Sequence, residues 1–277
     1  NDSLGNRLYA IAIETDIWYN IPQKNEYFIV KEKYMKAIVL AAGKGTRMNS
    51  DLPKVIHKCL GRPMVHYVIQ ACKDAGAGEV CVIVGYKGRE VKDAIYDVVD
   101  YVEQKEQLGT GHAVKCAKDF IGTEGDTLVL CGDTPLITGK TLTELVEKHR
   151  KEANGVTVLS AILDDATGYG RIIRDAAGNF EKIIEHKDAT EEERACKEVN
   201  SGMYIFNSEA LSASLDLLSN DNAAGEYYLT DTIALIKKIG LKVSALPLTG
   251  DACDEIRGVN TIDQLEEAEQ IMCHRED

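Results

Sequence analysis

The sequence predicts an α/β fold, with a doubly wound, mainly parallel mixed sheet and a β-rich subdomain in its second half. Two observations support this prediction. From Lys36 onward, short apolar runs alternate with amphipathic segments of helical period, and continuous apolar strands are typical of a parallel sheet covered on both faces. After Gly155 the pattern changes to shorter strand-like pieces separated by turns.

In the first half, three strands are expected, each followed later by a helix. The strands are KAIVLAA at 36–42, EVCVIVG at 79–85 and DTLVLCGD at 126–133, and the helices are MVHYVIQACKDAG at 64–76, REVKDAIYDVV at 89–99 and KTLTELVEKHRKEA at 140–153. The helix at 64–76 is the clearest of these, because Val65, Val68, Ile69 and Cys72 fall on one face and a glycine ends it.

In the second half, five short strands and two helices are expected. The strands are VTVLSAIL at 156–163, GRIIRD at 170–175, FEKIIEH at 180–186, VNSGMYIF at 199–206 and KVSALPL at 242–248, and the helices are EYYLTDTIALIKKIG at 226–240 and TIDQLEEAEQIM at 261–272. Tyr227 and Tyr228 are expected in the core at helical spacing. Thr261 and Gln264 have the spacing of a capping box at the start of the last helix.

The first 34 residues stand apart from this pattern. They contain Trp18, the only tryptophan, and four tyrosines, and Met35 directly precedes the first strand like a natural start. We expect residues 1–34 to be an upstream or vector-derived extension without a catalytic role, and a native strand pair is the alternative. Residues 35–277 are then one domain, with a nucleotide-binding half at 35–154 and a sugar-binding half with a closing helix at 155–277.

Composition restricts the classes of partner. The 277 residues are 44% hydrophobic and 28% charged, which suits a folded chain with an ample core. A net charge of −13 repels polyanions, so neither nucleic acid nor a membrane is an expected partner. No apolar run approaches the ~20 residues that cross a bilayer, and the start does not resemble a signal peptide. A cytoplasmic protein is therefore expected.

The eight cysteines are scattered, and no CxxC pair occurs. Most of them lie within apolar runs. Buried free thiols in a reducing compartment are the expected state. Structural zinc is not expected without paired ligands at short spacing.

Glycines and cations follow the first strand in the stretch LAAGKGTRMNSDLPK at 40–54. In open α/β sheets, ligands bind beyond the carboxyl ends of the strands. Gly43 and Gly45 allow backbone conformations closed to other residues and a close approach of backbone amides. Lys44, Arg47 and Lys54 concentrate positive charge in an acidic chain. The stretch therefore predicts a cradle for phosphate groups, with an ordinary glycine turn as the alternative.

Two standard phosphate-binding motifs are excluded at this loop. The Walker pattern requires a glycine where Ile38 stands, and the dinucleotide pattern GxGxxG requires one where Met48 stands.

Polar residues also follow two later strands. Asp133 ends the strand at 126–133, and a carboxylate beside bound phosphates suits Mg²⁺, although a turn-forming aspartate is the alternative. Gln104 can offer one donor and one acceptor to the edge of a base, and the amides near Gly109 and Thr110 can bond it as well. A helix start without a ligand is the alternative there. His112 is expected to pack or to support other residues rather than to catalyse.

The string LAAGKGTRMNSDLPKV resembles the signature of sugar-1-phosphate nucleotidylyltransferases. Further strings narrow the resemblance: EQLGTGHA at 106–113, CGDTPL at 131–136, TGYGRI at 167–172, EHKDAT at 185–190, NSG at 200–202, GEYYLTD at 225–231 and GVN at 258–260. Their order is similar to that in the uridylyltransferase domain of bacterial N-acetylglucosamine-1-phosphate uridylyltransferases, from Met35 to about Met272. The resemblance implies a Rossmann-like fold of the nucleotide-diphospho-sugar transferase type with a sugar-binding subdomain.

The resemblance also implies roles for individual residues. It gives the nucleotide to Leu40, Ala42, Gly43, Lys44, Gly45, Thr46, Arg47, Lys54, Gln104, Gly109 and Thr110, and the sugar to Gly170, Glu185, Asn200 and Thr230. Asp133 and Asn260 would hold Mg²⁺, and the catalytic residues would be Arg47, Lys54 and Asp133. His186 is expected to pack or cap rather than to act as a base.

The implied reaction transfers UMP from UTP to N-acetylglucosamine-1-phosphate and gives UDP-N-acetylglucosamine, a peptidoglycan precursor, with pyrophosphate. A sugar-phosphate oxygen would attack the α-phosphorus in line, and no general base is required. The chain shows no hexapeptide repeats, so acetyl transfer and the trimer that such repeats build are not expected, and a monomer or weak homo-oligomer is. A nucleotidylyltransferase for another sugar phosphate, or a sugar-nucleotide sensor without turnover, are the alternatives.

Overall fold

The computed structural model describes residues 17–19, 28–30, 34–222 and 224–276. The chain divides into two compact units, 1–34 and 35–277, and each is described by itself. In the first unit, β1 (Ile17–Tyr19) and β2 (Phe28–Val30) pair antiparallel. The other predictions for residues 1–34 concern residues outside the described ones or, like the absence of a catalytic role, remain predictions. The division of 35–277 into two functional halves remains a prediction too.

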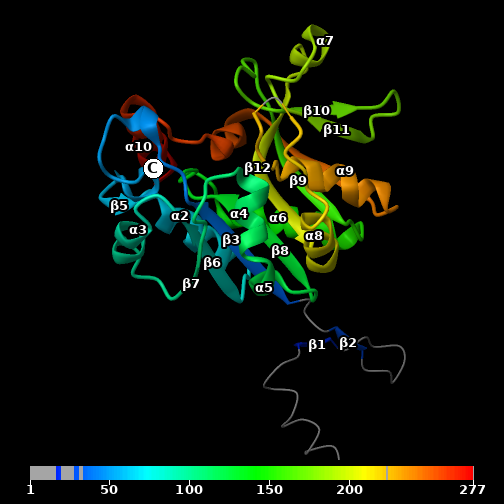
Figure 1. Cartoon of the computed structure of the whole chain (residues 1–277), viewed down its shortest axis with the longest axis horizontal. Helices are drawn as coiled ribbons and strands as arrows, with labels where there is room; N and C mark the ends of the chain where they lie inside the picture. Colours follow the sequence, from blue (N-terminus) through cyan, green and yellow to red (C-terminus); the bar gives the residue numbers. More distant parts are fainter. Residues whose placement is uncertain (1–16, 20–27, 31–33, 223, 277) are drawn as a thin grey trace, which may run out of the picture. The chain divides into compact units, whose positions relative to one another are not determined.

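The larger unit is built on a mixed sheet (Figure 1), which has nine strands in the described part of the chain. The strands are β3 (Met35–Ala41), β6 (Glu79–Val84), β7 (Asp100–Glu103), β8 (Asp126–Cys131), β9 (Val156–Ile162), β10 (Arg171–Arg174), β11 (Phe180–Ile184), β12 (Glu198–Asn207) and β13 (Val243–Leu248). The order is β11-β10-β12-β8-β3-β6-β7, and β9 pairs with both β12 and β13. Strands β7, β6, β3 and β8 are parallel, whereas β12 runs antiparallel to β8 and β9. The predicted α/β sheet is therefore confirmed.

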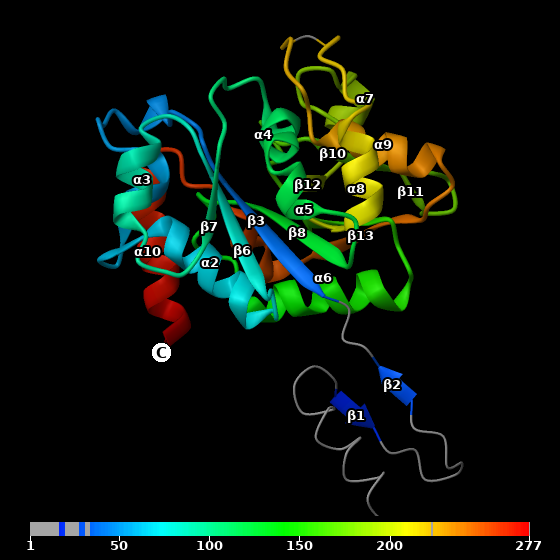
Figure 2. The same cartoon turned by 60° about the horizontal axis from the view of Figure 1, so that its bottom comes forward.

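Helices cover both faces of this sheet (Figure 2). One face packs against α2 (Met64–Asp74), α3 (Gly88–Ala94) and α6 (Gly139–Lys151), and the other packs against α4 (Thr110–Cys116), α5 (Lys118–Ile121), α8 (Ser208–Leu215) and α9 (Thr230–Lys238). Strand β3 shows why both faces are covered. Ala37 and Val39 belong to the first apolar cluster and Ile38 to the second, and all three are fully buried.

Two smaller pieces complete the unit. The closing helix α10 (Ile262–Glu276) shares a third apolar cluster with the hairpin of β4 (Lys58–Cys59) and β5 (Arg62–Pro63). The short helix α7 (Glu191–Arg194) begins with a capping box formed by Thr190 and Glu193.

Three expected helices differ at their ends. The helix expected at 89–99 stops at Ala94, because Ile95 is extended and the Asp97 carboxylate folds back to Lys73 of α2, at 3.0 Å. The helix expected from 226 begins at Thr230. Tyr227 instead bonds the backbone of Leu108 and Gly111, at 2.8 Å each, so the expectation of Tyr227 and Tyr228 in the core at helical spacing is wrong, and both are only partly buried.

The third difference is at the start of α10. The Thr261 hydroxyl accepts a bond from the Gln264 N–H at 3.2 Å, as in a capping box. The Gln264 side chain, however, accepts from the N–H of Asn260 at 2.7 Å rather than from that of Thr261. The bond therefore fixes the residue that precedes the cap.

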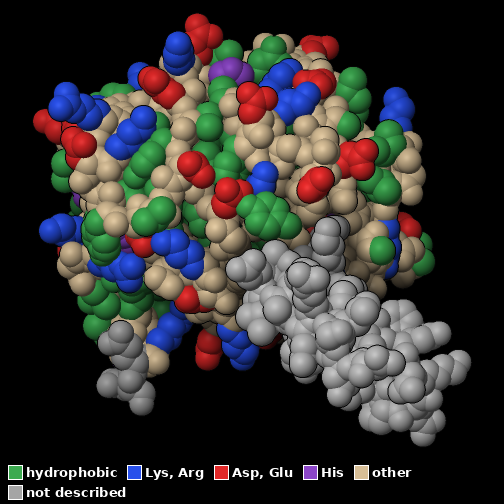
Figure 3. Space-filling view, turned by 90° about the horizontal axis from the view of Figure 1, so that it is seen from below, with side chains coloured by type: hydrophobic (Ala, Val, Ile, Leu, Met, Phe, Trp, Pro, Cys, Tyr) green, Lys and Arg blue, Asp and Glu red, His purple; other side chains and the backbone are tan. Residues whose placement is uncertain are grey.

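The cysteines agree only in part with the expectation of buried free thiols. All eight cysteines are free thiols, of which Cys59, Cys72, Cys81 and Cys253 are buried and Cys273 is exposed. Among the described residues, none of the helices is long and apolar enough to cross a membrane. On the face seen in Figure 3, acidic and basic side chains are intermixed.

The strand registers bring four strand ends to one edge of the sheet. Leu40 lies opposite Cys131, and Val84 lies opposite both Ala41 and Glu103. Hydrogen bonds continue this alignment beyond the strands, from the N–H of Gly132 to the carbonyl of Leu40 at 2.9 Å and from that of Gln104 to Val84 at 2.8 Å. The segments that follow β3, β6, β7 and β8 therefore meet at the same edge.

Candidate active site

The loop after β3 bends sharply at Gly45. Its φ of +63° is left-handed, and a Cβ at this position would lie 2.4 Å from the Cβ of Lys54. A glycine is therefore required both by the turn and by the close passage of the Lys54 side chain. A short 3-10 helix, η1 (Thr46–Met48), follows and leaves Arg47 exposed.

Gly43 plays a different part from the one that the sequence predicted for it. It does not have a positive φ, and nothing lies within 4 Å of the position where a Cβ would stand. Its missing side chain leaves open space at the wall of a cavity rather than permitting a turn. The expectation of a special backbone conformation thus holds for Gly45 and is wrong for Gly43.

A cavity of about 310 Å³ opens at the carboxyl edge of the sheet. It is lined by Leu40, Ala41, Ala42, Gly43, Lys54, Val55, Gln104, Gln107, Gly109, Thr110, Ala113, Cys131, Asp133 and Glu226. One wall comes from the loop after β3, one from the segment between β7 and α4, and one from the end of β8. Residues as far apart in the sequence as Leu40 and Glu226 therefore share one cavity.

Gln104 is almost completely buried at the end of β7, and its amide has one defined orientation. Its Nε2 donates to the carbonyl of Gly109 at 3.0 Å and lies 3.1 Å from Nδ1 of His112. Because a carbonyl can only accept, the amide nitrogen must face Gly109, and both of its hydrogens are engaged within the chain. The Gln104 side chain therefore has its carbonyl oxygen left for a ligand, rather than the donor and acceptor that the sequence suggested.

Gly109 is constrained as tightly as Gly45. Its φ is +110°, and a Cβ there would lie 2.5 Å from the backbone oxygen of Tyr227. The segment before α9 therefore packs directly against the start of α4 and holds Glu226 at the mouth of the cavity.

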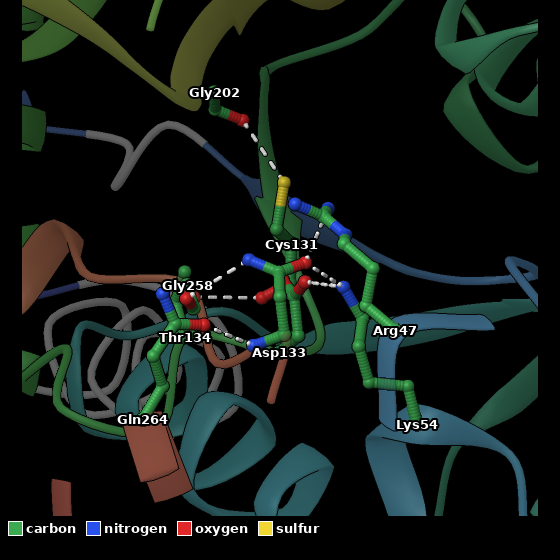
Figure 4. A network of polar contacts seen from close by, with 9 residues as sticks. Arg47, Lys54, Cys131, Asp133, Thr134, Gly202, Gly258 and Gln264 are labelled. Atoms are coloured by element: carbon green, nitrogen blue, oxygen red, sulfur yellow. Dashed lines mark hydrogen bonds and ion pairs between the residues drawn. The ribbon is translucent and has the colours of Figure 1, made fainter. Parts of the chain in front are cut away.

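Two side chains that line the cavity, those of Lys54 and Asp133, meet those of Arg47 and Asn260 in a charged cluster (Figure 4). The Lys54 ammonium forms an ion pair with the Asp133 carboxylate and donates to Oδ1 of Asn260 at 2.9 Å. Arg47 donates to the same oxygen at 2.8 Å. The side chains of Lys54 and Asp133 are each 17% exposed, so this pair is shielded from much of the solvent.

Backbone and side-chain contacts fix the two oxygen groups of this cluster. The N–H of Val259 donates to the carbonyl of Asp133 at 2.8 Å, which ties the segment before α10 to the end of β8. The Asn260 amide nitrogen donates to the carbonyl of Gly258 at 3.1 Å, so Oδ1 must point toward the cations. Gln264 holds the N–H of Asn260, as described above.

The donor set of this cluster fits a hard divalent cation. A carboxylate of Asp133 and an amide oxygen of Asn260 converge on one atom, the Lys54 nitrogen, so a single cation can reach both. Mg²⁺ binds through one or two protein oxygens and fills its other positions with phosphate oxygens and water. Among the described residues, no group of three or more His, Cys, Asp or Glu side chains is suited to a metal.

The four residues expected to bind a sugar also lie together. Thr230, the first residue of α9, donates to Glu185 at 3.2 Å, and a Cβ on Gly170 would lie 3.4 Å from the other oxygen of that carboxylate. The N–H of Asn200 donates to the carbonyl of Gly170 at 2.9 Å. Burial is the main cause that raises the pKa of the Glu185 carboxyl, while the Thr230 hydrogen bond lowers it by less.

An irregularity in β12 connects this cluster to the end of β8. The register with β9 slips between Asn200 and Tyr204, and Gly202 in between has a φ of +77°. The carbonyl of Gly202 accepts from the Cys131 thiol at 3.7 Å (Figure 4). Burial and the nearby Asp133 carboxylate raise the pKa of this thiol to about 12, so it is neutral and not a nucleophile at physiological pH.

The structure thus gathers most of the predicted residues. Those that line the cavity are Leu40, Ala42, Gly43, Lys54, Gln104, Gly109, Thr110 and Asp133, whereas Arg47 and Asn260 join the charged cluster. Lys44, Gly45 and Thr46 are not among the lining residues, and the Lys44 ammonium lies 5.9 Å from the centre of the Tyr86 ring. The four sugar-side residues form a cluster of their own. Their roles stay predictions.

Six lining residues were missed from the sequence: Ala41, Val55, Gln107, Ala113, Cys131 and Glu226. All six lie in strings that resemble the nucleotidylyltransferases. The register of β8 with β3 places Cys131 opposite Leu40. Glu226 is brought to the cavity by the contact between Gly109 and Tyr227, which the sequence does not reveal.

Comparisons with known proteins agree with this architecture. The family model for nucleotidyl transferases matches residues 36–250. The protein named "Bifunctional protein GlmU" from Caldanaerobacter subterraneus subsp. tengcongensis is 52% identical over 239 residues, which are 86% of this chain and 52% of that protein. The proteins of the same name from Thermoanaerobacter pseudethanolicus and Clostridioides difficile are 50% and 49% identical. The chain spans about half the length of these relatives.

Two solved structures share the fold at low sequence identity. A UDP-glucose pyrophosphorylase complexed with UDP-glucose has a TM-score of 0.70 at 18% identity, over 87% of this chain and 99% of its own. A UDP-glucose pyrophosphorylase from Acinetobacter baumanii has a TM-score of 0.66 at 19% identity, over 85% and 92%. Since the family model spans more than half of the residues and the relatives are about half identical, the chain belongs to the nucleotidyl transferase family.

Proposed function

We propose that the chain transfers UMP from UTP to N-acetylglucosamine-1-phosphate and releases UDP-N-acetylglucosamine and pyrophosphate. The observation that carries the proposal is the cluster of Lys54, Asp133, Asn260 and Arg47 at the end of a cavity that also holds Gln104. Polyphosphate chemistry requires cations and metal ligands, and pyrimidine selection requires a directed polar group. Relatives at about 50% identity support the same reading, as does a solved neighbour that is complexed with a UDP-sugar.

The proposed reaction is one in-line displacement. A phosphate oxygen of the sugar phosphate forms a bond to the α-phosphorus of UTP, and the bond from that phosphorus to the bridging oxygen of the β-phosphate breaks. Pyrophosphate carries away the electron pair. The attacking oxygen is already an anion near neutral pH, so catalysis consists of positioning and charge stabilisation rather than proton removal.

The residues of the cluster divide this work. Lys54 neutralises charge at the α-phosphate, and Arg47 steadies the leaving pyrophosphate. Asp133 and Asn260 would hold Mg²⁺, which when bound supplies positive charge to the phosphate oxygens that gather there. Gly43 lines the cavity, and backbone N–H groups of its loop can bond the phosphates there.

The base and the sugar occupy opposite parts of the site in this proposal. The Gln104 carbonyl oxygen accepts from N3–H of uracil, a group that cytosine lacks. Glu185, Asn200 and Thr230 bond the hydroxyl and acetamido groups of the sugar, while Gly170 leaves room for the ring. The proposal concerns only the half of the longer relatives that this chain spans.

The experiment that tests the proposal measures pyrophosphate release from a matrix of nucleotides and sugar phosphates. UTP, CTP, ATP and GTP are each combined with the 1-phosphates of N-acetylglucosamine, glucose and N-acetylgalactosamine, in the presence of Mg²⁺. The highest kcat/KM is expected for UTP with N-acetylglucosamine-1-phosphate. A higher value for another sugar would correct the substrate, and binding of UDP-N-acetylglucosamine without any release would replace the enzyme with a sensor.

A further inference from the structure

The cations of the cluster lie where a metal ion is expected. Lys54 contacts both of the oxygen groups that would hold Mg²⁺, the carboxylate of Asp133 and Oδ1 of Asn260 (Figure 4). Arg47 contacts the Asn260 oxygen as well. Each proposed metal ligand is therefore already bound to a positive group that belongs to the chain itself.

This arrangement is well defined rather than a loose surface ion pair. Both partners of the pair between Lys54 and Asp133 are 17% exposed, so the attraction is screened less than it would be on an open surface. The Asn260 oxygen is aimed by the bond from its amide nitrogen to Gly258. A metal that enters must displace the Lys54 ammonium from two oxygens.

The cavity offers Lys54 another partner. Lys54 and Gly43 both line it, and Gly43 leaves open space on the side where phosphates would lie. The missing side chain of Gly45 gives the stem of Lys54 room to pass close to the loop, since a Cβ there would be only 2.4 Å away. A flexible four-carbon stem can then carry the ammonium from the oxygens to a phosphate.

We infer that Lys54 occupies the metal position in the free chain, so that a divalent cation binds weakly until a nucleoside triphosphate draws Lys54 away. The inference rests on the proposed function, because it takes a nucleotide as the group that moves Lys54. It makes metal and nucleotide binding mutually dependent: whatever factor the nucleotide adds to metal affinity, the metal adds to nucleotide affinity. Charge stays paired throughout, since Asp133 exchanges one cation for another.

The test measures Mn²⁺ binding to the free chain by electron paramagnetic resonance, with no nucleotide or sugar present. The variants are Lys54→Met and Lys54→Gln, and the matched control is Lys44→Met, which removes a loop cation that makes no contact with Asp133 or Asn260 in the described structure. The Lys54 variants are expected to bind Mn²⁺ about tenfold more tightly or better, which corresponds to ~1.4 kcal/mol. Lys44→Met is expected to bind as the unchanged chain does, and the double variant Lys54→Met with Asp133→Asn is expected to lose the gain.

Two results would overturn the inference. One is Mn²⁺ affinity in both folded Lys54 variants, checked by circular dichroism, that equals or falls below that of the unchanged chain. The other is an equal gain in Lys44→Met, which would point to a general effect of charge. Neither result depends on turnover. A chain that passes this test and releases no pyrophosphate keeps the inference and loses the proposed function. A chain that releases pyrophosphate and fails this test keeps the proposed function and loses the inference.

Discussion

Asp133 is the residue on which the proposed chemistry depends most directly. It ends β8 at the edge of the sheet, lines the cavity and pairs with Lys54. Its position follows from the register of β8 with β3, because Cys131 lies opposite Leu40. A carboxylate could be predicted there from the sequence. Its partners could not, because Lys54 is 79 positions from Asp133 in the sequence and Asn260 is 206 positions from Lys54.

Replacing Asp133 by Asn should abolish turnover while UTP binding persists at reduced strength. The amide keeps the size of the side chain and removes the negative charge that would hold the metal. Steady-state pyrophosphate release and calorimetric titration of UTP measure the two effects separately. Near-normal turnover of the Asp133→Asn chain in saturating Mg²⁺ would remove Asp133 from the metal site.

UTP should be preferred strongly over CTP because the Gln104 amide has one orientation. Its carbonyl oxygen matches the N3–H of uracil and faces the bare N3 of cytosine. A buried mismatch of this kind costs ~1–3 kcal/mol, which is about ten- to hundredfold in kcat/KM. The ratio of kcat/KM for UTP and CTP is the measurement, and equal values would count decisively against the assignment of Gln104.

Variants of His112 provide a second test of the orientation of the Gln104 amide. Its Nδ1 accepts from Gln104, so His112→Leu should loosen the amide and lower the ratio, whereas His112→Asn, which can place an acceptor near the same point, should preserve more of it. A uniform loss of rate with both nucleotides in His112→Leu would mean that the histidine supports only packing.

Glu185 should make the stability of the chain depend on pH. Burial raises the pKa of its carboxyl above the ordinary 4.5. A raised pKa in the folded state means that this group favours folding most below pH 4.5 and that the contribution is lost as the pH rises through the folded-state value. Glu185→Gln, which stays neutral, should therefore melt higher than the unchanged chain at pH 8 and nearly equally at pH 4.

The same variant should raise the KM for the sugar phosphate and leave the KM for UTP nearly unchanged. Melting curves at both pH values and steady-state kinetics give the two readouts. A melting temperature at pH 8 that is lower than that of the unchanged chain would show that the Glu185 charge is compensated within the fold.

At the scale of elements, the loop after β3 depends on two glycines for two reasons. Gly45 has a left-handed φ and a close neighbour in Lys54, while Gly43 has neither and faces the cavity. The sequence could indicate a glycine-rich phosphate loop after a strand, because strand ends and glycine pairs are local signals. It could not separate the two roles, because the neighbour of Gly45 lies nine positions further along the chain.

Gly45→Ala should reduce kcat by at least tenfold, because the added methyl group displaces Lys54. Gly43→Ala should instead raise the KM for UTP, since the methyl group enters the cavity. Gly178→Ala is the matched control, because Gly178 also has a positive φ, of +82°, but nothing lies within 4 Å of its Cβ position. It should lose ~1 kcal/mol of stability through backbone strain and keep its activity. An active Gly45→Ala chain with unchanged kinetics would contradict the close passage of Lys54.

Other elements show where local signals end. The parallel strands and the helices at 64–74 and 139–151 were predictable, because apolar periodicity and terminal glycines are signals within the local sequence. Helix α8 was not predicted, although Asn207 caps it by accepting from the N–H of Ala210 at 3.0 Å. The late start of α9 could not be predicted either, because the backbone of Tyr227 is hydrogen-bonded to Leu108 and Gly111 of a distant segment. Tertiary contacts of this kind override helical periodicity.

At the scale of the whole molecule, the described residues of the proposed site all lie in the unit 35–277. The cavity, the charged cluster and the sugar-side cluster all draw on elements between β3 and α10. The sequence indicated most of these residues through strings that resemble one family, whereas physical reasoning alone supplied the phosphate loop, Asp133 and the base contacts at Gln104, Gly109 and Thr110. The irregularity of β12 that brings Asn200 and Gly202 toward β8 left no local signal beyond a glycine.

A chain that starts at Met35 should therefore keep its kcat and its KM for both substrates. Every described residue of the proposed site follows Met35, and β3 begins there. Steady-state kinetics of the two chains side by side, with circular dichroism as the folding control, provide the comparison. A folded chain from Met35 that has lost most of its activity would place residues 1–34 in the site.

The most direct test of the account is ³¹P nuclear magnetic resonance of the reaction itself. UTP, N-acetylglucosamine-1-phosphate and Mg²⁺ are mixed with the unchanged chain and, in parallel, with the Asp133→Asn chain. With the unchanged chain only, we expect the two diphosphate resonances of UDP-N-acetylglucosamine and the single resonance of pyrophosphate to grow together in equal amounts. Conversion of UTP to UDP and phosphate, or an unchanged spectrum over many hours, would contradict uridylyl transfer.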